Sequence, residues 1–235
     1  MTLARRIEDE WLDALPADDP RAVRARRDLR RVNAWALLPG IVARALVKHA
    51  PERPRRLLDL GTGDGSFMLE IARRLASRWP GVTATLLDRQ DIVSPQIRAA
   101  FAALSWNVET VTADVFDFLG DAQSPTADVI TSNLFLHHFS EDRLAGLFAR
   151  AAPKCILFLA CEPRRAKFTV RASRMLWAIG CADVIVHDAV ASARAGFNDR
   201  ELSALWPGRS DWDLDEHPSG LFTHSFVARR TLVNR

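Results

Sequence analysis

Short apolar runs and amphipathic segments alternate through the middle of this chain. Runs rich in branched apolar residues predict strands over 56–60, 83–88, 107–112, 129–133 and 155–161. Apolar residues at helical spacing predict helices over 67–78, 95–103 and 142–151. Strands that alternate with helices in this way favour a parallel sheet covered by helices on both faces.

Both ends of the chain have a different pattern. The first fifty residues are helical in character with a dense arginine run, and a proline pair at 51–54 separates them from the first strand. We therefore expect an N-terminal helical cap over 1–50 and one domain over 51–235. A helical insert is expected over about 164–207, above the substrate pocket. The ranges 212–216 and 221–229 predict a closing antiparallel hairpin.

These patterns together predict an α/β fold. It is a Rossmann-like, mostly parallel seven-stranded sheet with a C-terminal antiparallel hairpin, helices on both faces, a helical cap and a helical insert. The length of 235 residues, with 48% hydrophobic and 26% charged residues, suits one globular domain of this kind.

Composition and charge limit the expected partners and the expected cellular compartment of the protein. The net charge of +3 permits nucleic-acid binding without requiring it. Three cysteines without CxxC spacing indicate free thiols in a reducing compartment and no metal site. The most apolar early stretch, 34–47, is too short to span a membrane. With no signal-peptide pattern at the start, a cytoplasmic protein without a membrane span is expected.

The segment 57–67, LLDLGTGDGSF, carries the strongest chemical signal. A buried strand runs into Gly61, Gly63 and Gly65, which let the backbone turn and approach a ligand closely. A helix follows, with its N-terminus toward that ligand. A dinucleotide-binding loop would need glycine at the sixth position of this pattern, where Ser66 stands.

With Asp59 two residues before the first glycine, the pattern Asp-x-Gly-x-Gly-x-Gly resembles motif I of the class I S-adenosylmethionine (SAM) methyltransferases. The resemblance implies SAM as cofactor and S-adenosylhomocysteine (SAH) as product. The cofactor-binding residues implied in this loop are Asp59, Gly61, Thr62, Gly63 and Gly65.

Four later positions extend the expected cofactor site. Asp88 ends the second strand, where a carboxylate accepts hydrogen bonds from ribose hydroxyls, and Arg89 would flank the adenine. In the family, an acid after the third strand accepts from the adenine amino group and its neighbour donates a backbone N–H; Asp114 and Val115 match these positions. Alternatively, Asp114 only caps the next helix.

Asn133 ends the fourth strand and completes the expected cofactor contacts. Methyltransferases that act on DNA adenine carry Asn/Asp-Pro-Pro-aromatic here, and Asn133-Leu-Phe-Leu departs from that pattern. The following Leu-His-His-Phe is similar to small-molecule methyltransferases. His138, or less favourably His137, would then deprotonate a phenol, because histidine titrates near neutrality. The alternative is that such a histidine only holds the loop.

The insert adds polar candidates for substrate binding: His187, Asp188 and Arg194. Its string from His187 through Pro207 resembles bacterial methyltransferases encoded near polyketide-type phenol-forming enzymes. These side chains would orient a hydroxyl or carboxylate of an aromatic substrate, or else pair and cap helices. His187 and Asp188 form no relay by themselves, because adjacent residues do not share a helix face.

One further acid and five aromatic residues are expected around the site. Glu162, after the fifth strand, is expected to be a structural acid paired with Arg164 or Arg165; the alternative is that it lines the substrate pocket. Candidate apolar walls of the pocket are Trp35, Phe135, Trp177, Phe197 and Trp206.

The sequence therefore predicts a SAM-dependent methyltransferase that acts on a small aromatic molecule of the phenol, quinone or polyketide type, at a hydroxyl. RNA methylation and SAM binding without catalysis remain as alternatives, whereas Ser66 and the hairpin disfavour a nicotinamide oxidoreductase. A small-molecule substrate is the expected partner rather than nucleic acid, and a homodimer is compatible with the sequence.

Overall fold

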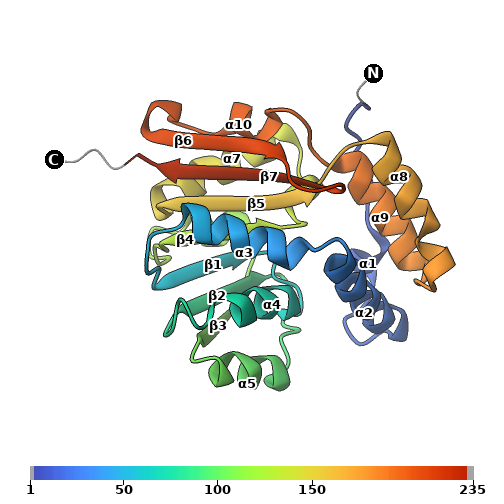
Figure 1. The fold of residues 1–235 in the computed structure, drawn as a ribbon, viewed down its shortest axis with the longest axis horizontal. Coiled ribbons are helices and arrows are strands. Elements are labelled where there is room, and N and C mark those ends of the chain that lie inside the picture. The colour runs from blue at the N-terminus through green and yellow to red at the C-terminus, as the bar shows by residue number, and fades with distance from the viewer. Residues whose placement is uncertain (1–2, 232–235) are drawn as a thin grey trace.

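The protein is organised around one mixed sheet of seven strands (Figure 1). The structure is a computed structural model that describes residues 3–231. The strand order is β3-β2-β1-β4-β5-β7-β6, in which β1 to β5 are parallel, and β7 runs antiparallel to both β5 and β6. The strands are β1 (Arg56–Leu60), β2 (Thr83–Asp88), β3 (Asn107–Thr112), β4 (Val129–Asn133), β5 (Leu157–Pro163), β6 (Trp212–Pro218) and β7 (Thr223–Arg230). The predicted fold is confirmed, and four strands have the predicted bounds.

The central strands are apolar because helices cover both of their faces. Every residue of β5 is buried, as are four of the five residues of β1. On one face, α3, α4 and α5 pack around a core that includes Leu46, Met68 and Phe101. On the other face, α6, α7 and α10 pack around Phe148 and Phe158. A continuous apolar strand satisfies both layers at once.

The sheet-covering helices and short turns have the following bounds: α3 (Leu38–His49), α4 (Ser66–Leu75), α5 (Pro95–Ala103), α6 (Val115–Gly120), η1 (Leu136–His138), α7 (Glu141–Ala151), η2 (Ala152–Lys154), α10 (Glu201–Leu205) and η4 (Arg209–Asp211). The remaining helices are α1 (Trp11–Ala14), α2 (Pro20–Trp35), α8 (Lys167–Arg174), η3 (Met175–Ile179) and α9 (Asp183–Ala195).

A separate group of helices stands beyond one end of the sheet. Figure 1 shows α1, α2, α8 and α9 together past the carboxyl ends of the parallel strands. Ala25 of α2 packs there with Cys181, Val184 and Ile185 in a small apolar cluster of its own. The first fifty residues therefore divide, because α1 and α2 join the insert whereas α3 packs on the sheet.

Two sequence expectations concern the described residues as a whole. Cys155, Cys161 and Cys181 are buried and free, as predicted. Within 3–231, no helix combines the length and apolarity needed to cross a membrane.

Candidate active site

A cleft of about 1090 Å³ opens at the carboxyl ends of β1, β2 and β4. Its floor is made by the loops that follow these strands, and α1, α2 and α4 contribute its walls. Ligands of open α/β folds bind at this edge of the sheet. Gly61, Gly63, Asp88, Arg89 and Asn133, all predicted from sequence, line the cleft.

The glycine loop needs glycine for two different reasons. All three glycines have positive φ, with values of 69° at Gly61, 58° at Gly63 and 74° at Gly65. A Cβ on Gly61 would lie 2.3 Å from the ring of Phe135, so this glycine permits close packing. A Cβ on Gly63 would meet nothing within 4 Å, so that position leaves room in the cleft.

Two acids lie beside this loop, of which Asp59 is buried and Asp88 is partly buried. Asp88 accepts hydrogen bonds from the N–H groups of Gly63 at 2.8 Å and Gln90 at 3.0 Å, which ties the loop to the end of β2. Asp59 accepts from the hydroxyl of Thr131 at 2.7 Å. Burial raises the pKa of Asp59 to about 6, so its carboxylate would be favoured by a cationic ligand.

Unpaired polar atoms in the cleft fit a polar ligand. Among the described residues, the hydroxyl of Thr62 and both amide atoms of Asn133 are buried without a hydrogen-bond partner. Both side chains line the cleft. Because buried polar groups are almost always satisfied, these atoms are suited to a bound molecule such as the nucleoside and amino-acid parts of SAM.

Asp114 and Val115 lie outside the lining of this cleft. The Asp114 carboxylate accepts from the N–H of Phe116 at 2.8 Å and caps α6, and Val115 is buried in the core. The helix-capping alternative is therefore observed, and their contact with adenine stays a prediction.

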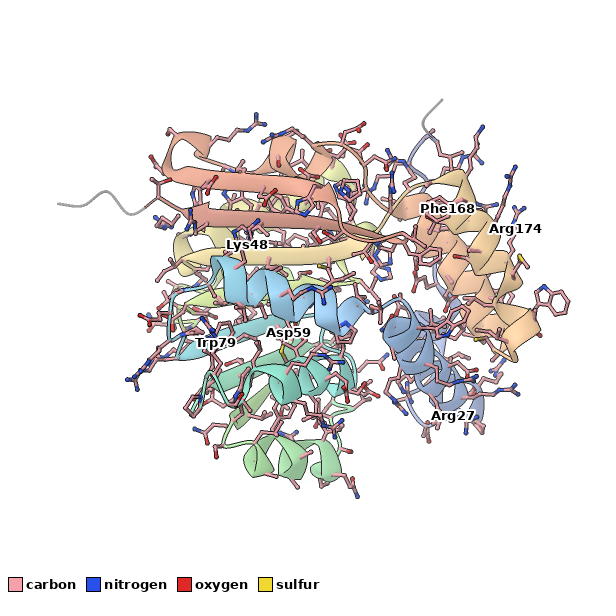
Figure 2. All side chains as sticks on the ribbon, in the orientation of Figure 1. Arg27, Lys48, Asp59, Trp79, Phe168 and Arg174 are labelled. Atoms are coloured by element: carbon pink, nitrogen blue, oxygen red, sulfur yellow. The ribbon has the colours of Figure 1, made fainter. Side chains whose placement is uncertain are left out.

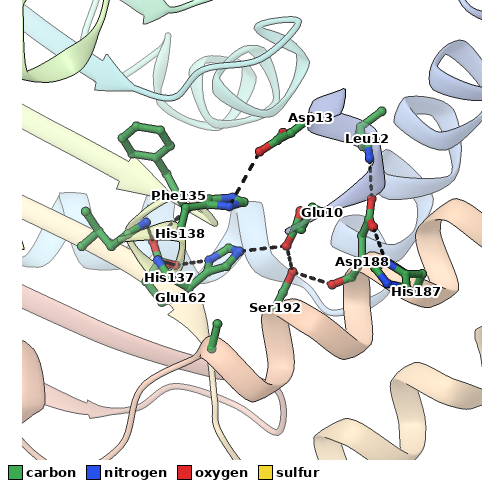
Figure 3. A network of polar contacts seen from close by, with 12 residues as sticks. Glu10, Leu12, Asp13, Phe135, His137, His138, Glu162, His187, Asp188 and Ser192 are labelled. Carbon is green, nitrogen blue, oxygen red and sulfur yellow. Dashed lines mark hydrogen bonds and ion pairs between the residues drawn. The ribbon is translucent and has the colours of Figure 1, made fainter. Parts of the chain in front are cut away.

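His137 lies buried between two carboxylates (Figure 3). Its Nδ1 is 2.7 Å from Glu162 and its Nε2 is 3.2 Å from Glu10. Burial alone disfavours the cation, but hydrogen bonds with Glu10 and Glu162 outweigh it and raise the pKa of His137 to about 9. His137 is thus a fixed imidazolium at neutral pH and holds no lone pair for a proton.

The prediction that Glu162 pairs with Arg164 or Arg165 was wrong. Glu162 is a structural acid, but it accepts from the backbone N–H groups of Phe135 at 3.0 Å and Leu136 at 2.9 Å in addition to its pair with His137. Arg165 instead pairs with Glu201. Glu162 therefore shapes the turn that carries both histidines.

His138 has the opposite character to its neighbour. Its Nδ1 lies 3.8 Å from a carboxylate oxygen of Asp13, and Asp13 lines the cleft. Burial and the adjacent charge of His137 lower the pKa of His138, so the ring is neutral at pH 7. The His138 ring does not itself line the cleft; it lies next to Asp13 of α1, which does, and a neutral imidazole in this position can accept a proton.

The N-terminal strap, which we define as residues 3–15, closes this end of the cleft. Arg5 donates to the carbonyls of Ala195 at 2.7 Å and Phe139 at 2.9 Å. Glu10 lies against His137, as described above, and accepts from Ser192. Leu12 and Asp13 of the strap then form part of the cleft wall.

The polar residues of the insert hold the strap and do not line the cleft. Asp188 accepts from the N–H groups of Trp11 at 2.8 Å and Leu12 at 3.0 Å. The ring of His187 stacks on Trp11 at 3.9 Å, and Arg194 pairs with Glu8. The side chains of His187 and Asp188 meet at 2.9 Å although the residues are adjacent on the helix.

Four of the five aromatic wall predictions are also corrected. Trp35 and Trp177 are about three-quarters and two-thirds exposed, and Trp206 packs with Phe148 in the core beneath α7. Phe197 is likewise buried in that core. Phe135 alone is close to the cleft, against the glycine loop.

A metal ion has one geometrically possible location among the described residues. Glu10, His137 and His138 each offer one ligand atom, all within 4.8 Å of one another. Both ring nitrogens of His137 already face carboxylates, and an imidazolium cannot coordinate a metal. The residues present therefore satisfy one another without an ion.

Sequence reasoning missed the residues contributed by the strap. Glu10 reaches His137 across 127 positions of sequence, and Arg5 reaches Phe139 across 134. Neither lies in a motif, so only the folded chain brings them to the site.

Comparison with known proteins agrees with this geometry. Residues 57–153 match the model of a protein family described as "Methyltransferase domain". A trans-aconitate 2-methyltransferase of Mycobacterium tuberculosis is 38% identical over 90 residues, which are 38% of this chain and 30% of that protein. An uncharacterized methyltransferase of Mycobacterium bovis is 37% identical over 91 residues, 38% of this chain and 40% of its own length. The chain thus matches less than half the length of these curated relatives.

Solved structures share the fold over most of the chain. The plantazolicin methyltransferase BpumL in complex with SAH superposes with a TM-score of 0.64 at 13% identity, over 91% of this chain and 92% of that one. The pyocyanin biosynthetic protein PhzM superposes with a TM-score of 0.60 at 19% identity, over 95% of this chain and 62% of that one.

The fold and the cleft define a Rossmann-like α/β domain with a closing hairpin. Within that fold, residues 57–153 are similar to a methyltransferase domain, in agreement with the resemblance carried by the glycine loop.

Proposed function

We propose that this protein binds SAM in the cleft and transfers its methyl group to a hydroxyl of a small aromatic acceptor. The observation that carries the proposal is the cleft at the carboxyl ends of β1, β2 and β4. It combines an open Gly63, the Asp88 carboxylate and the unpaired polar atoms of Thr62 and Asn133.

Each of these residues has a part in holding the cofactor. The Asp88 carboxylate would accept from the ribose hydroxyls, and Asp59 would favour the positive charge of the ligand. Thr62 and Asn133 would complete the polar contacts. Bound SAM supplies a methyl group made electrophilic by its sulfonium, so the protein itself must orient the acceptor and manage one proton.

His138 is the residue we assign to that proton. The acceptor hydroxyl loses its proton to the neutral ring of His138 as the oxygen takes the methyl group. Asp13, 3.8 Å from Nδ1, stabilises the imidazolium that forms. His137 cannot do this work, because it is already protonated; together with Glu162 it fixes the turn on which His138 stands.

The aromatic class of the acceptor is supported by the side chains around His138. Phe135 and Phe139 pack edge to face at 5.0 Å, and Phe135 lies 6.4 Å from the His138 ring. The matched methyltransferase segment, 57–153, excludes the strap and α2, which form the rest of this wall. The acceptor named for the mycobacterial relative is therefore a weaker guide than these residues.

The charges around the cleft do not favour RNA as acceptor. Arg30 pairs with Asp64 at 2.7 Å, and Arg74 pairs with Glu70 at 3.0 Å. Cations that neutralise local acids leave little positive potential for a phosphate backbone.

The test is methyl transfer from labelled SAM to pooled phenols, pooled aliphatic carboxylic acids and RNA. We expect label on phenols, and we expect His138→Gln to lower kcat by about 100-fold or more with unchanged SAM affinity. His217→Gln, at an exposed histidine of β6, is the matched control. Label on RNA or carboxylic acids alone would refute the acceptor class, and SAM binding with no transfer would indicate a binding protein.

A further inference from the structure

The turn between α8 and α9 ends in an exposed apolar tip, which we define as residues Met175–Ile179 (η3). Met175 is 65% exposed, Trp177 67% and Ile179 41%. None of them lines the cleft. A tryptophan, a methionine and an isoleucine that face water within five residues form a patch of the kind that marks an interaction surface.

Arginines from two helices surround the tip. Arg24 and Arg31 of α2 donate to the carbonyls of Gly180 at 3.5 Å and Ile179 at 3.4 Å, which holds their guanidinium groups beside it. Arg171 and Arg174 are exposed on the last turn of α8. Figure 2 shows Arg174 on the side of α8 that faces away from the sheet.

We call Arg24, Arg31, Arg171 and Arg174 the collar. Acidic residues neutralise the charge of this collar only in part. Asp28 is buried and lies between Arg24 and Arg31, at 3.9 Å and 3.1 Å. Asp183, at the start of α9, is the exposed acid next to the tip. With Arg27 also exposed on α2 (Figure 2), the cations outnumber the acids.

We propose that this tip docks the protein on the surface of an anionic lipid bilayer. Tryptophan prefers the boundary between headgroups and acyl chains, and methionine and isoleucine gain free energy when they leave water. Arginines around such an anchor meet lipid phosphates while their aliphatic stems stay against the apolar layer.

The charge of the collar favours lipid over a second copy of the chain. Two copies that met through this tip would bring like-charged collars together, which opposes association. An anionic bilayer offers both an apolar layer for Trp177 and opposite charge for the arginines.

The tip is mechanically connected to the acceptor end of the cleft. The helix α9, which starts just after the tip, holds the strap through Asp188, and the strap carries Asp13. Docking would therefore bring this end of the cleft near the bilayer, where lipid-dissolved aromatics concentrate; this consequence alone rests on the proposed function.

The experiment is co-sedimentation of the full chain with phosphatidylcholine vesicles that do or do not contain phosphatidylglycerol. We expect binding only to the anionic vesicles. Arg171→Gln/Arg174→Gln should weaken partitioning roughly 25-fold, since each cation contributes about fivefold. Met175→Ser/Trp177→Ser should weaken it by about tenfold or more.

Matched controls are Val47→Ser, an exposed apolar position of α3, and Arg55→Gln/Arg78→Gln, exposed arginines in the segments that lead into β1 and β2. These variants should bind as the parent does, with thermal unfolding measured for all. Absence of vesicle binding by the parent, or binding that survives the tip substitutions, would refute the proposal. A dimer that dissociates on Trp177→Ser without any vesicle binding would assign the tip to a second copy. Vesicle binding without methyl transfer would refute the proposed function and leave the docking surface in place.

Discussion

The buried charge of His137 makes a quantitative prediction about stability. The ring is almost fully buried between Glu10 and Glu162, and its pKa rises from 6.5 to about 9 on folding. A tenfold change in proton affinity corresponds to about 1.4 kcal/mol, so the bound proton stabilises the fold by about 3 kcal/mol.

The direction of the pH dependence follows from the raised pKa. A histidine with a higher pKa in the folded state contributes its full stabilisation below pH 6.5 and loses it as pH rises through 9. Between pH 6 and 8.5, the free energy of unfolding should therefore fall by about 2 kcal/mol from this group alone. Burial raises the pKa values of Cys155 and Cys161 to about 12. These thiols therefore change the free energy of unfolding mainly above pH 9, outside this range.

The measurement is urea unfolding of the parent and of His137→Gln across this pH range. Glutamine keeps hydrogen-bonding capacity at the site but does not titrate, so the difference between the two curves isolates the histidine. That difference should shrink by about 2 kcal/mol from pH 6 to 8.5. His217→Gln, at a half-exposed ring, is the control. A difference that stays constant with pH would show that folding does not raise the pKa of His137.

Three further substitutions test other parts of the site. Asp88→Asn should weaken SAM binding about 10- to 100-fold by titration calorimetry, because it removes a charged acceptor that also ties down the N–H of Gly63; unchanged affinity would exclude Asp88 from the cofactor site. Gly61→Ala should lower the melting temperature, since the new Cβ would lie 2.3 Å from the ring of Phe135 at a backbone φ of 69°, and Gly61→Ala/Phe135→Ala should recover only the steric part. Asp188→Asn should weaken capping of α1 by about 1 kcal/mol and speed protease cleavage within the strap, and equal cleavage rates would contradict its anchoring role.

Much of the fold could be predicted because its signals are local. The strands β1 to β4 were found at their observed bounds, since a parallel sheet buried on both faces requires nearly continuous apolar runs. The glycine loop could be predicted equally well, because a positive φ and the close approach of the backbone to neighbouring groups permit few residue types. The same applies to Asp88, which ends its strand.

Other parts of the site could not be predicted from the chain alone. The choice between His137 and His138 depends on Glu10 and Asp13, which approach from the N-terminus and belong to no motif. Two adjacent histidines look alike in sequence, and their protonation states differ only because one is enclosed by carboxylates.

The sequence by itself determined the sheet, the loop that faces the cofactor and the class of the domain, because periodicity, glycine and strand-end acids act over a few neighbouring residues. The tertiary structure alone decided how the acceptor end is built. There the strap and insert meet, and Asp188 supports a helix instead of a substrate. Burial and distance set the charge of each group at that end, and both depend on contacts between segments more than a hundred residues apart.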